Sequence, residues 1–216
     1  TEMALVLNTP FSIIRTLSLK DLDKKNYFSD TELNDIYTPV ILPSETAVFK
    51  KKNIVVLIVE SFGKEYTGAY NDYKGYTPFL DSLVGVSSSF KYSYANGSKS
   101  IDAIPSSITG VLYVQDHFIL SKYASRNHLN SFANLLKPKG YTSAFMHGAP
   151  NGSMGFWAFC KQMGFDQYFG YSEFNNEAEF DGTWGIWDEP FLSFSIDKMN
   201  GLKQPFYNLI FTLSSH

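Results

Sequence analysis

The sequence predicts an α/β protein with a mostly parallel central sheet and helices on both faces. Continuous apolar runs, at 53–59 and 206–213, are typical of strands that helices cover on both sides. Amphipathic segments with helix caps and stops lie between such runs, so strand and helix alternate along the chain. The 216 residues are 44% hydrophobic and 18% charged, which excludes a disordered chain.

The first half of the chain divides near residue 50. Residues 1–50 have mixed polarity and several prolines, and we expect an arm or linker there, followed by a domain over 51–216. Asn53–Val59 is the first predicted strand. Thr77 and Pro78 are an N-cap and a first-turn proline for a short helix to Leu83. Ser88–Tyr94 alternates aromatic and polar residues, which predicts a strand.

The second half continues the alternation. The stripe Leu129, Phe132, Ala133, Leu136 predicts a helix that Pro138 and Gly140 end, and Tyr141–Met146 is the next strand. We expect Ser153 to cap a helix that ends at Gly164, with Phe156, Trp157 and Cys160 on one face. A further helix begins at Asp188 and ends near Gly201, before the last strand at 206–213.

Three predicted strands end in residues that can bind a metal or move a proton, namely Glu60, His147 and His216. In open parallel sheets the functional groups gather beyond the carboxyl ends of the strands. The sequence therefore predicts a site at this edge. For Glu60 alone, a solvated residue or a cap of the next helix is an equally ordinary interpretation.

A polar turn, Asn96–Asp102, precedes an apolar stretch that we expect to be helical. If Ser100 stands at the helix start, free backbone N–H groups would favour a bound phosphate or a developing alkoxide there. A serine at this place is more often only an N-cap, and Pro105 leaves the exact start of the helix open.

Val59-Glu60-Ser61-Phe62-Gly63 offers a rival chemistry, because it approximates a nucleophile elbow, with Asp188 and His216 following in hydrolase order. A metal-free serine hydrolase using Ser61 is therefore an alternative, although Val59 stands where a tight elbow requires glycine.

His117 and His128 are expected at the surface. Nucleic acid is not an expected partner, since the net charge is −3 and the arginines are Arg15 and Arg126.

Several segments together resemble the extracellular catalytic domain of lipoteichoic acid synthases, phosphoglycerol transferases of the sulfatase and alkaline phosphatase superfamily. They are Asn53–Phe62, Gly97–Asp102, His147–Trp157 and Phe211–His216, with Leu5–Leu17 similar to the segment that joins the family's membrane helices to that domain. The resemblance makes 51–216 the N-terminal part of a sulfatase-like catalytic domain, truncated at its C-terminus, and 1–50 the linker.

The resemblance implies roles for individual residues. Glu60 and Ser100 match the positions that bind a divalent metal, Mn²⁺ or Mg²⁺ with Zn²⁺ as a further option, and Ser100 matches the nucleophile. It places His216 and His147 at the substrate phosphate and Trp157 along the pocket. Asn151 is a further expected substrate contact. The remaining metal ligands are expected beyond residue 216, so we expect the isolated fragment to be inactive.

The implied reaction is the transfer of a phosphoglycerol-type head group from a phospholipid to an acceptor hydroxyl, through a covalent serine intermediate. The family's Arg after the Trp is absent, because Ala158 and Phe159 stand there, and so the head group or acceptor is open. Alternatives are a phosphoethanolamine transferase, a phosphodiesterase, a sulfatase and a non-catalytic binding ectodomain. A sulfatase requires a C/S-x-P-x-R context, which the sequence after Ser100 lacks.

The resemblance also implies a location. Family members act on the outer side of a bacterial cytoplasmic membrane, tethered by N-terminal membrane helices. We therefore expect membrane association through such helices, which are not among these 216 residues, and a catalytic domain on the extracellular or periplasmic side.

Overall fold

The computed structural model describes residues 10, 25–38, 41–42, 46, 48–113, 115 and 117–214. The chain forms two units, 1–49 and 50–216. In the first unit, helix α3 (Asp30–Ile36) begins with a reciprocal cap, in which Ser29 accepts from the backbone of Glu32 and the Glu32 carboxylate accepts from Ser29. This short helix was not predicted from the sequence.

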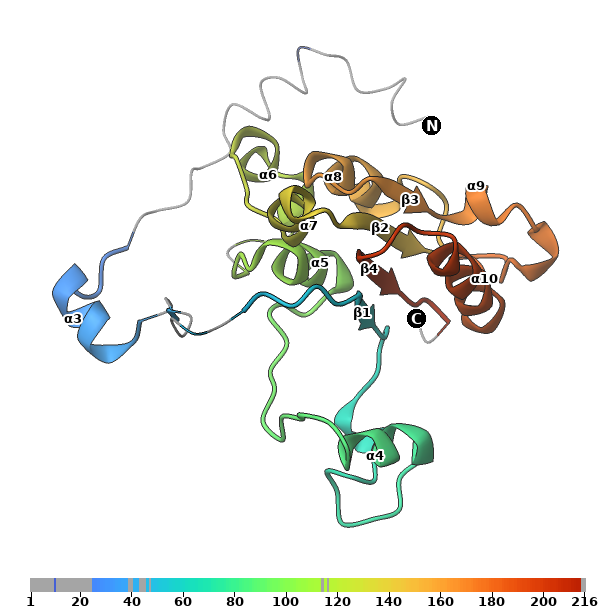
Figure 1. Cartoon of the computed structure of the whole chain (residues 1–216), viewed down its shortest axis with the longest axis horizontal. Helices are drawn as coiled ribbons and strands as arrows, with labels where there is room; N and C mark the ends of the chain where they lie inside the picture. Colours follow the sequence, from blue (N-terminus) through green and yellow to red (C-terminus); the bar gives the residue numbers. More distant parts are fainter. Residues whose placement is uncertain are drawn as a thin grey trace. The chain divides into compact units, whose positions relative to one another are not determined.

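The second unit contains a four-stranded sheet (Figure 1). Its strands are β1 (Ile54–Ile58), β2 (Thr142–His147), β3 (Gln167–Phe169) and β4 (Phe206–Phe211), in the order β1-β4-β2-β3 with every pair parallel. The α-helices of this unit are α4 (Pro78–Val84), α5 (Ser100–Thr109), α6 (Lys122–Arg126), α7 (Phe132–Leu136), α8 (Phe156–Gln162), α9 (Tyr171–Phe174) and α10 (Asp188–Asn200). Short 3₁₀ turns are η1 (Lys64–Tyr66), η2 (Phe118–Leu120), η3 (Lys137–Lys139), η4 (Ser153–Gly155) and η5 (Glu177–Glu179).

Helices cover the sheet on both faces, which confirms the predicted fold class. On one face, side chains from α5, α7 and α8, including Ile104 and Phe156, pack on Phe145 and Leu209 of the strands. On the other face, Phe191 of α10 packs with Ala144, Met146 and Ile210. The continuous apolar runs of β2 and β4 follow from this double burial, because neither face of these strands meets water.

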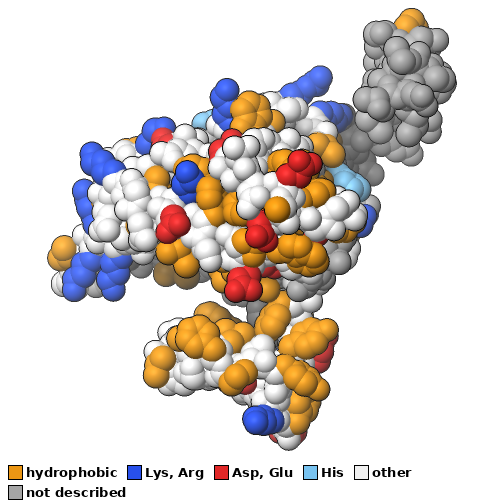
Figure 2. Space-filling model, turned by 90° about the vertical axis from the view of Figure 1, so that its right-hand side faces the viewer, with side chains coloured by type: hydrophobic (Ala, Val, Ile, Leu, Met, Phe, Trp, Pro, Cys, Tyr) orange, Lys and Arg blue, Asp and Glu red, His pale blue; other side chains and the backbone are white. Residues whose placement is uncertain are grey.

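Strand β1 is an edge strand, and its two faces differ. Ile54, Val56 and Ile58 pack against the core, whereas Val55 and Leu57 are about half exposed. Figure 2 shows further apolar side chains at the surface of the lobe that contains α4, where Phe79 is exposed. The strand nevertheless ends as predicted, with Glu60 just beyond it.

Two predicted features differ from the structure, and one strand was not predicted. Ser88–Tyr94 is not a strand: it pairs with no described strand, and Phe90, Tyr92 and Tyr94 are exposed, because alternation stabilises a strand only where one face is buried. Ser153 does not cap α8, since Gly155 with φ +75° stands at that cap and Ser153 lies in η4. The short strand β3 was missed.

Candidate active site

Glu60 lies where β1 leaves the sheet, and its backbone N–H donates to the Thr212 hydroxyl beyond β4 at 2.9 Å. The Thr212 side chain therefore holds the backbone from which the Glu60 carboxylate projects. Its two oxygens accept from two serines: Oε1 from Ser61 at 2.8 Å, and Oε2 from Ser100. Residues 40 positions apart in the sequence thus meet at the carboxyl edge of the sheet.

Ser100 is the first residue of α5, and Lys99 is the N-cap. The helix runs to Thr109 with Pro105 inside it, where the proline has no N–H to donate to the carbonyl of Ile101. Ile101, Ile104 and Ile108 are buried in the core beneath the sheet, so α5 is held firmly. The Ser100 hydroxyl therefore projects from a rigid element, beside free backbone N–H groups.

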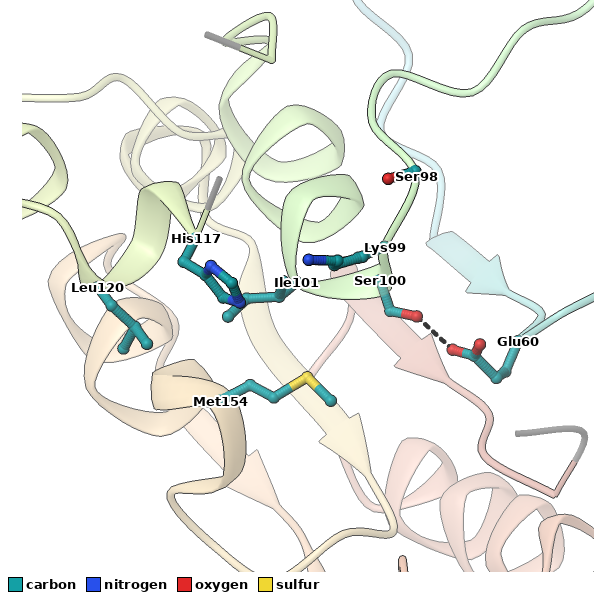
Figure 3. Close-up of a pocket in the computed structure, with 8 residues that line it drawn as sticks. All are labelled: Glu60, Ser98, Lys99, Ser100, Ile101, His117, Leu120 and Met154. Carbon is teal, nitrogen blue, oxygen red and sulfur yellow. Dashed lines mark hydrogen bonds between the residues drawn. The ribbon is translucent and has the colours of Figure 1, made fainter. Parts of the chain in front are cut away.

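Glu60 and Ser100 line a cavity of about 430 Å³ (Figure 3). Its other lining residues are Ser98, Lys99, Ile101, His117, Leu120 and Met154. A second cavity, of about 230 Å³, is more apolar and is lined by Glu60, His147, Ala149, Ser153, Met154, Trp184, Phe211 and Leu213. Because Glu60 and Met154 line both cavities, the two hollows adjoin at the carboxylate.

His147 ends β2 and is 2% exposed. Its Nδ1 lies 3.1 Å from the carbonyl oxygen of Phe211, which can only accept, so Nδ1 carries the proton and Nε2 keeps a free lone pair. Burial lowers the pKa of His147 to about 4, against the opposing effects of the Phe211 carbonyl and the Glu60 charge. The neutral ring therefore accepts hydrogen bonds through Nε2, which suits a substrate hydroxyl better than a phosphate oxygen.

Two expected contacts lie elsewhere. Trp157 is 47% exposed and lines a separate hollow with Cys160 and Tyr168, because the buried stripe of α8 is Phe156, Phe159 and Cys160. Asn151 donates to the Glu173 carboxylate and accepts from the Ser172 N–H. Neither residue lines the two cavities at Glu60, and His216 lies outside the described residues.

The serine hydrolase alternative finds little support at Ser61. Its φ of +48° is unusual for a non-glycine residue and would suit an elbow, but its hydroxyl is exposed and bonded to Glu60. Both Asp188 oxygens accept backbone N–H groups, from Leu213 at 2.7 Å and Ser214 at 3.0 Å. Asp188 therefore anchors the segment after β4.

Comparison with known proteins identifies the family. The Sulfatase family profile matches residues 52–216, which is most of the chain.

The chain belongs to the sulfatase family.

Several relatives of this sulfatase-family chain are known. Lipoteichoic acid synthase 2 of Bacillus subtilis is 29% identical over 173 residues, which cover 76% of this chain and 26% of the relative. A solved protein of the alkaline phosphatase superfamily from Vibrio parahaemolyticus is 30% identical with a TM-score of 0.66, over 78% of this chain and 41% of that one. The lipoteichoic acid synthase LtaP of Listeria monocytogenes shares the fold, at 21% identity and a TM-score of 0.59, over 76% and 41% of the respective chains. The chain thus spans about a quarter of its curated relative's length.

Glu60 and Ser100 offer oxygen atoms that could bind a metal ion. A carboxylate and a hydroxyl, from Glu60 and Ser100, are the hard oxygen donors that Mg²⁺ and Mn²⁺ prefer. In the described part of the chain, no three His, Cys, Asp or Glu side chains gather closely enough to hold a metal ion. The pair therefore fits such a cation as part of a ligand set.

None of the helices formed by the described residues has the length and apolarity that crossing a bilayer requires.

The lining residues without a role in the sequence prediction include Lys99, His117, Met154 and Trp184. Lys99 adjoins Ser100, so the same turn could have indicated it. His117 was expected to be an ordinary surface residue, and neither periodicity nor a motif marks it as part of a site. Met154 has φ +52°, a backbone conformation that only the structure reveals. These residues enter the site through loops, where sequence patterns carry little information.

Proposed function

We propose that the protein is a metal-dependent phosphotransferase that moves a phosphoglycerol-type head group from a phospholipid to an acceptor hydroxyl, with Ser100 as the covalent nucleophile. The contact between the Ser100 hydroxyl and the Glu60 carboxylate carries this proposal. It joins a nucleophile at a helix start to a metal-binding carboxylate at a strand end, inside a cavity. The lipoteichoic acid synthases among the relatives support the same reaction class.

The cavity sizes and polarities support the choice of substrate. The phosphoryl group would lie beside Ser100 at the start of α5, where backbone N–H groups and the helix dipole favour negative charge. The glycerol would extend into the smaller cavity, where Nε2 of His147 accepts from a hydroxyl and Trp184 supplies an apolar wall. A free phosphate would leave this second cavity unused.

Glu60 and Ser100 would hold the divalent cation, with further ligands from outside the described residues. A bound cation lowers the pKa of a coordinated hydroxyl and neutralises phosphate charge. The Ser100 oxygen then attacks phosphorus, the bond to the lipid oxygen breaks, and diacylglycerol leaves. An acceptor hydroxyl displaces Ser100 in the second step. We place this reaction at the outer side of a bacterial cytoplasmic membrane, as the similarity to lipoteichoic acid synthases implies.

The test compares Ser100→Ala with Ser61→Ala in the full-length protein supplied with Mn²⁺. Both serines donate to Glu60, so both variants remove one hydrogen bond from the same carboxylate. We expect Ser100→Ala to lose diacylglycerol release from phosphatidylglycerol and to yield no phosphoglycerol adduct by peptide mass spectrometry, with Ser61→Ala close to wild type. Loss of activity in Ser61→Ala but not in Ser100→Ala, with an activity that a chelator does not reduce, would establish the serine hydrolase alternative instead.

A further inference from the structure

His117 stands on the opposite wall of the larger cavity from the Glu60–Ser100 pair (Figure 3). The pair belongs to the end of β1 and the start of α5, whereas His117 precedes η2. Met154 and Ile101 line the space between these walls. A volume of about 430 Å³ is enough for a phosphodiester group to lie between the serine oxygen and the imidazole.

The backbone of His117 is held in an uncommon conformation, with φ +54° and ψ +44°. A non-glycine residue in this left-handed region costs free energy, and it persists only where neighbouring groups fix it. Here the His117 N–H donates to Oδ1 of Asp102 at 3.2 Å. Asp102 is 2% exposed and lies in the first turn of α5, two residues after Ser100. The backbone of His117 is therefore tied to the helix that carries the nucleophile.

In-line displacement at phosphorus gives the opposite wall a chemical role. The attacking and leaving oxygens lie on opposite sides of the phosphorus, so a group bound to Ser100 on one wall has its leaving oxygen directed away from Ser100. An alkoxide of a lipid glycerol is a poor leaving group and requires a proton. Across the cavity from Ser100, Leu120 and Met154 are apolar, whereas the His117 imidazole has nitrogen atoms that can donate and accept a proton.

We propose that His117 is the acid–base residue on the leaving-group side of the reaction, a catalytic role that rests on the proposed function of Ser100. In the first step the P–O bond to the lipid breaks, and protonated His117 gives its proton to the departing diacylglycerol oxygen. In the second step the acceptor hydroxyl gives its proton to His117 as its oxygen bonds to phosphorus. The P–Oγ bond of Ser100 then breaks, and Oγ takes back from solvent water the proton that it released to water on attack. Asp102 acts as a positioning residue through its contact with the His117 backbone.

Leaving-group dependence tests this role. The full-length protein with Mn²⁺ is given two donors with the same phosphoglycerol group, phosphatidylglycerol and 4-nitrophenyl phosphoglycerol. Nitrophenolate is a good leaving group that needs no proton, whereas the lipid alkoxide must be protonated as it leaves. His117→Asn is the chosen variant because asparagine tolerates a positive φ. We expect it to slow release from phosphatidylglycerol by about 10²- to 10³-fold and to leave the nitrophenolate burst within about threefold of wild type.

The controls separate this role from folding and from the nucleophile. His128→Asn changes an exposed histidine and should leave both donors unaffected. His117→Gly, which also fits φ +54°, should reproduce the selective loss. Asp102→Ala should show a weaker selective loss that Asp102→Asn restores, because the amide oxygen still accepts from His117. Equal slowing of both donors by both His117 variants, or no slowing of either donor, would overturn the proposal. Absence of any Ser100 adduct in the wild type would instead refute the proposed function itself.

Discussion

The imidazole of His147 stacks on the ring of Phe211, with the ring centroids 4.5 Å apart, and its Nδ1 lies 3.1 Å from the Phe211 carbonyl oxygen. This relationship crosses two paired strands, because His147 and Phe211 are register partners at the ends of β2 and β4. One residue thus supplies both an apolar surface and a hydrogen-bond acceptor to the ring. The result is a neutral histidine at the edge of the sheet where the two cavities adjoin.

The burial of His147 predicts how stability depends on pH. Its pKa is about 4 in the folded chain and 6.5 without burial, so between these values the unfolded chain binds a proton that the folded chain does not. The free energy of unfolding should therefore fall as the pH drops through this window, by up to roughly 3 kcal/mol. His147→Gln should flatten this dependence in urea titrations at pH 7, 6 and 5. An unchanged slope, or equal flattening by the exposed His128→Gln, would contradict the prediction.

Glu60 should dominate metal affinity. Replacing its carboxylate by the neutral amide in Glu60→Gln keeps the size of the side chain and removes the charge that binds the cation. We expect Mn²⁺ to bind the full-length protein at least about tenfold more weakly by isothermal titration calorimetry. Glu65→Gln alters an exposed glutamate five residues away and should leave binding unchanged. Equal affinities for Glu60→Gln and wild type would remove Glu60 from the metal site.

The two tryptophans should behave differently in catalysis. Trp184 lines the smaller cavity with Glu60, whereas Trp157 lines a separate hollow with Cys160. Trp184→Ala should raise KM for a phosphoglycerol donor by about tenfold, because an apolar wall of the substrate site is lost. Trp157→Ala should stay within about twofold of wild type. Steady-state kinetics with both variants decides between this arrangement and the one implied by the family resemblance, in which Trp157 lines the pocket.

The rigidity of α5 should depend on its buried isoleucines. Ile104 is fully buried beneath the sheet, so Ile104→Ala leaves a cavity and should lower the free energy of unfolding by about 2–5 kcal/mol. Ile196→Ala, at a half-exposed position of α10, should change it by less than about 0.5 kcal/mol. Chemical denaturation of both variants measures the difference. Similar losses would show that α5 is not packed as the structure describes.

Much of the central fold could be predicted because its signals are local. The apolar run before Glu60 marks a strand, although Val55 and Leu57 on one of its faces stay about half exposed, and Pro205 and Gly201 mark the connection into β4. Ser88–Tyr94 shows the limit of such signals. Its alternation is that of a strand, yet whether a partner strand lies beside it depends on the rest of the fold, and no described strand does.

The sequence by itself indicated where Glu60 and Ser100 lie, just after a strand and near a helix start, because each position is marked by its neighbouring residues. Only the tertiary structure decided what surrounds them. Placing β4 between β1 and β2 brings His147 and Glu60 to one edge of the sheet, and the loop before η2 brings His117 to the same cavity. Such proximity depends on how crossover connections pack over the whole sheet, and no local pattern in the sequence records it.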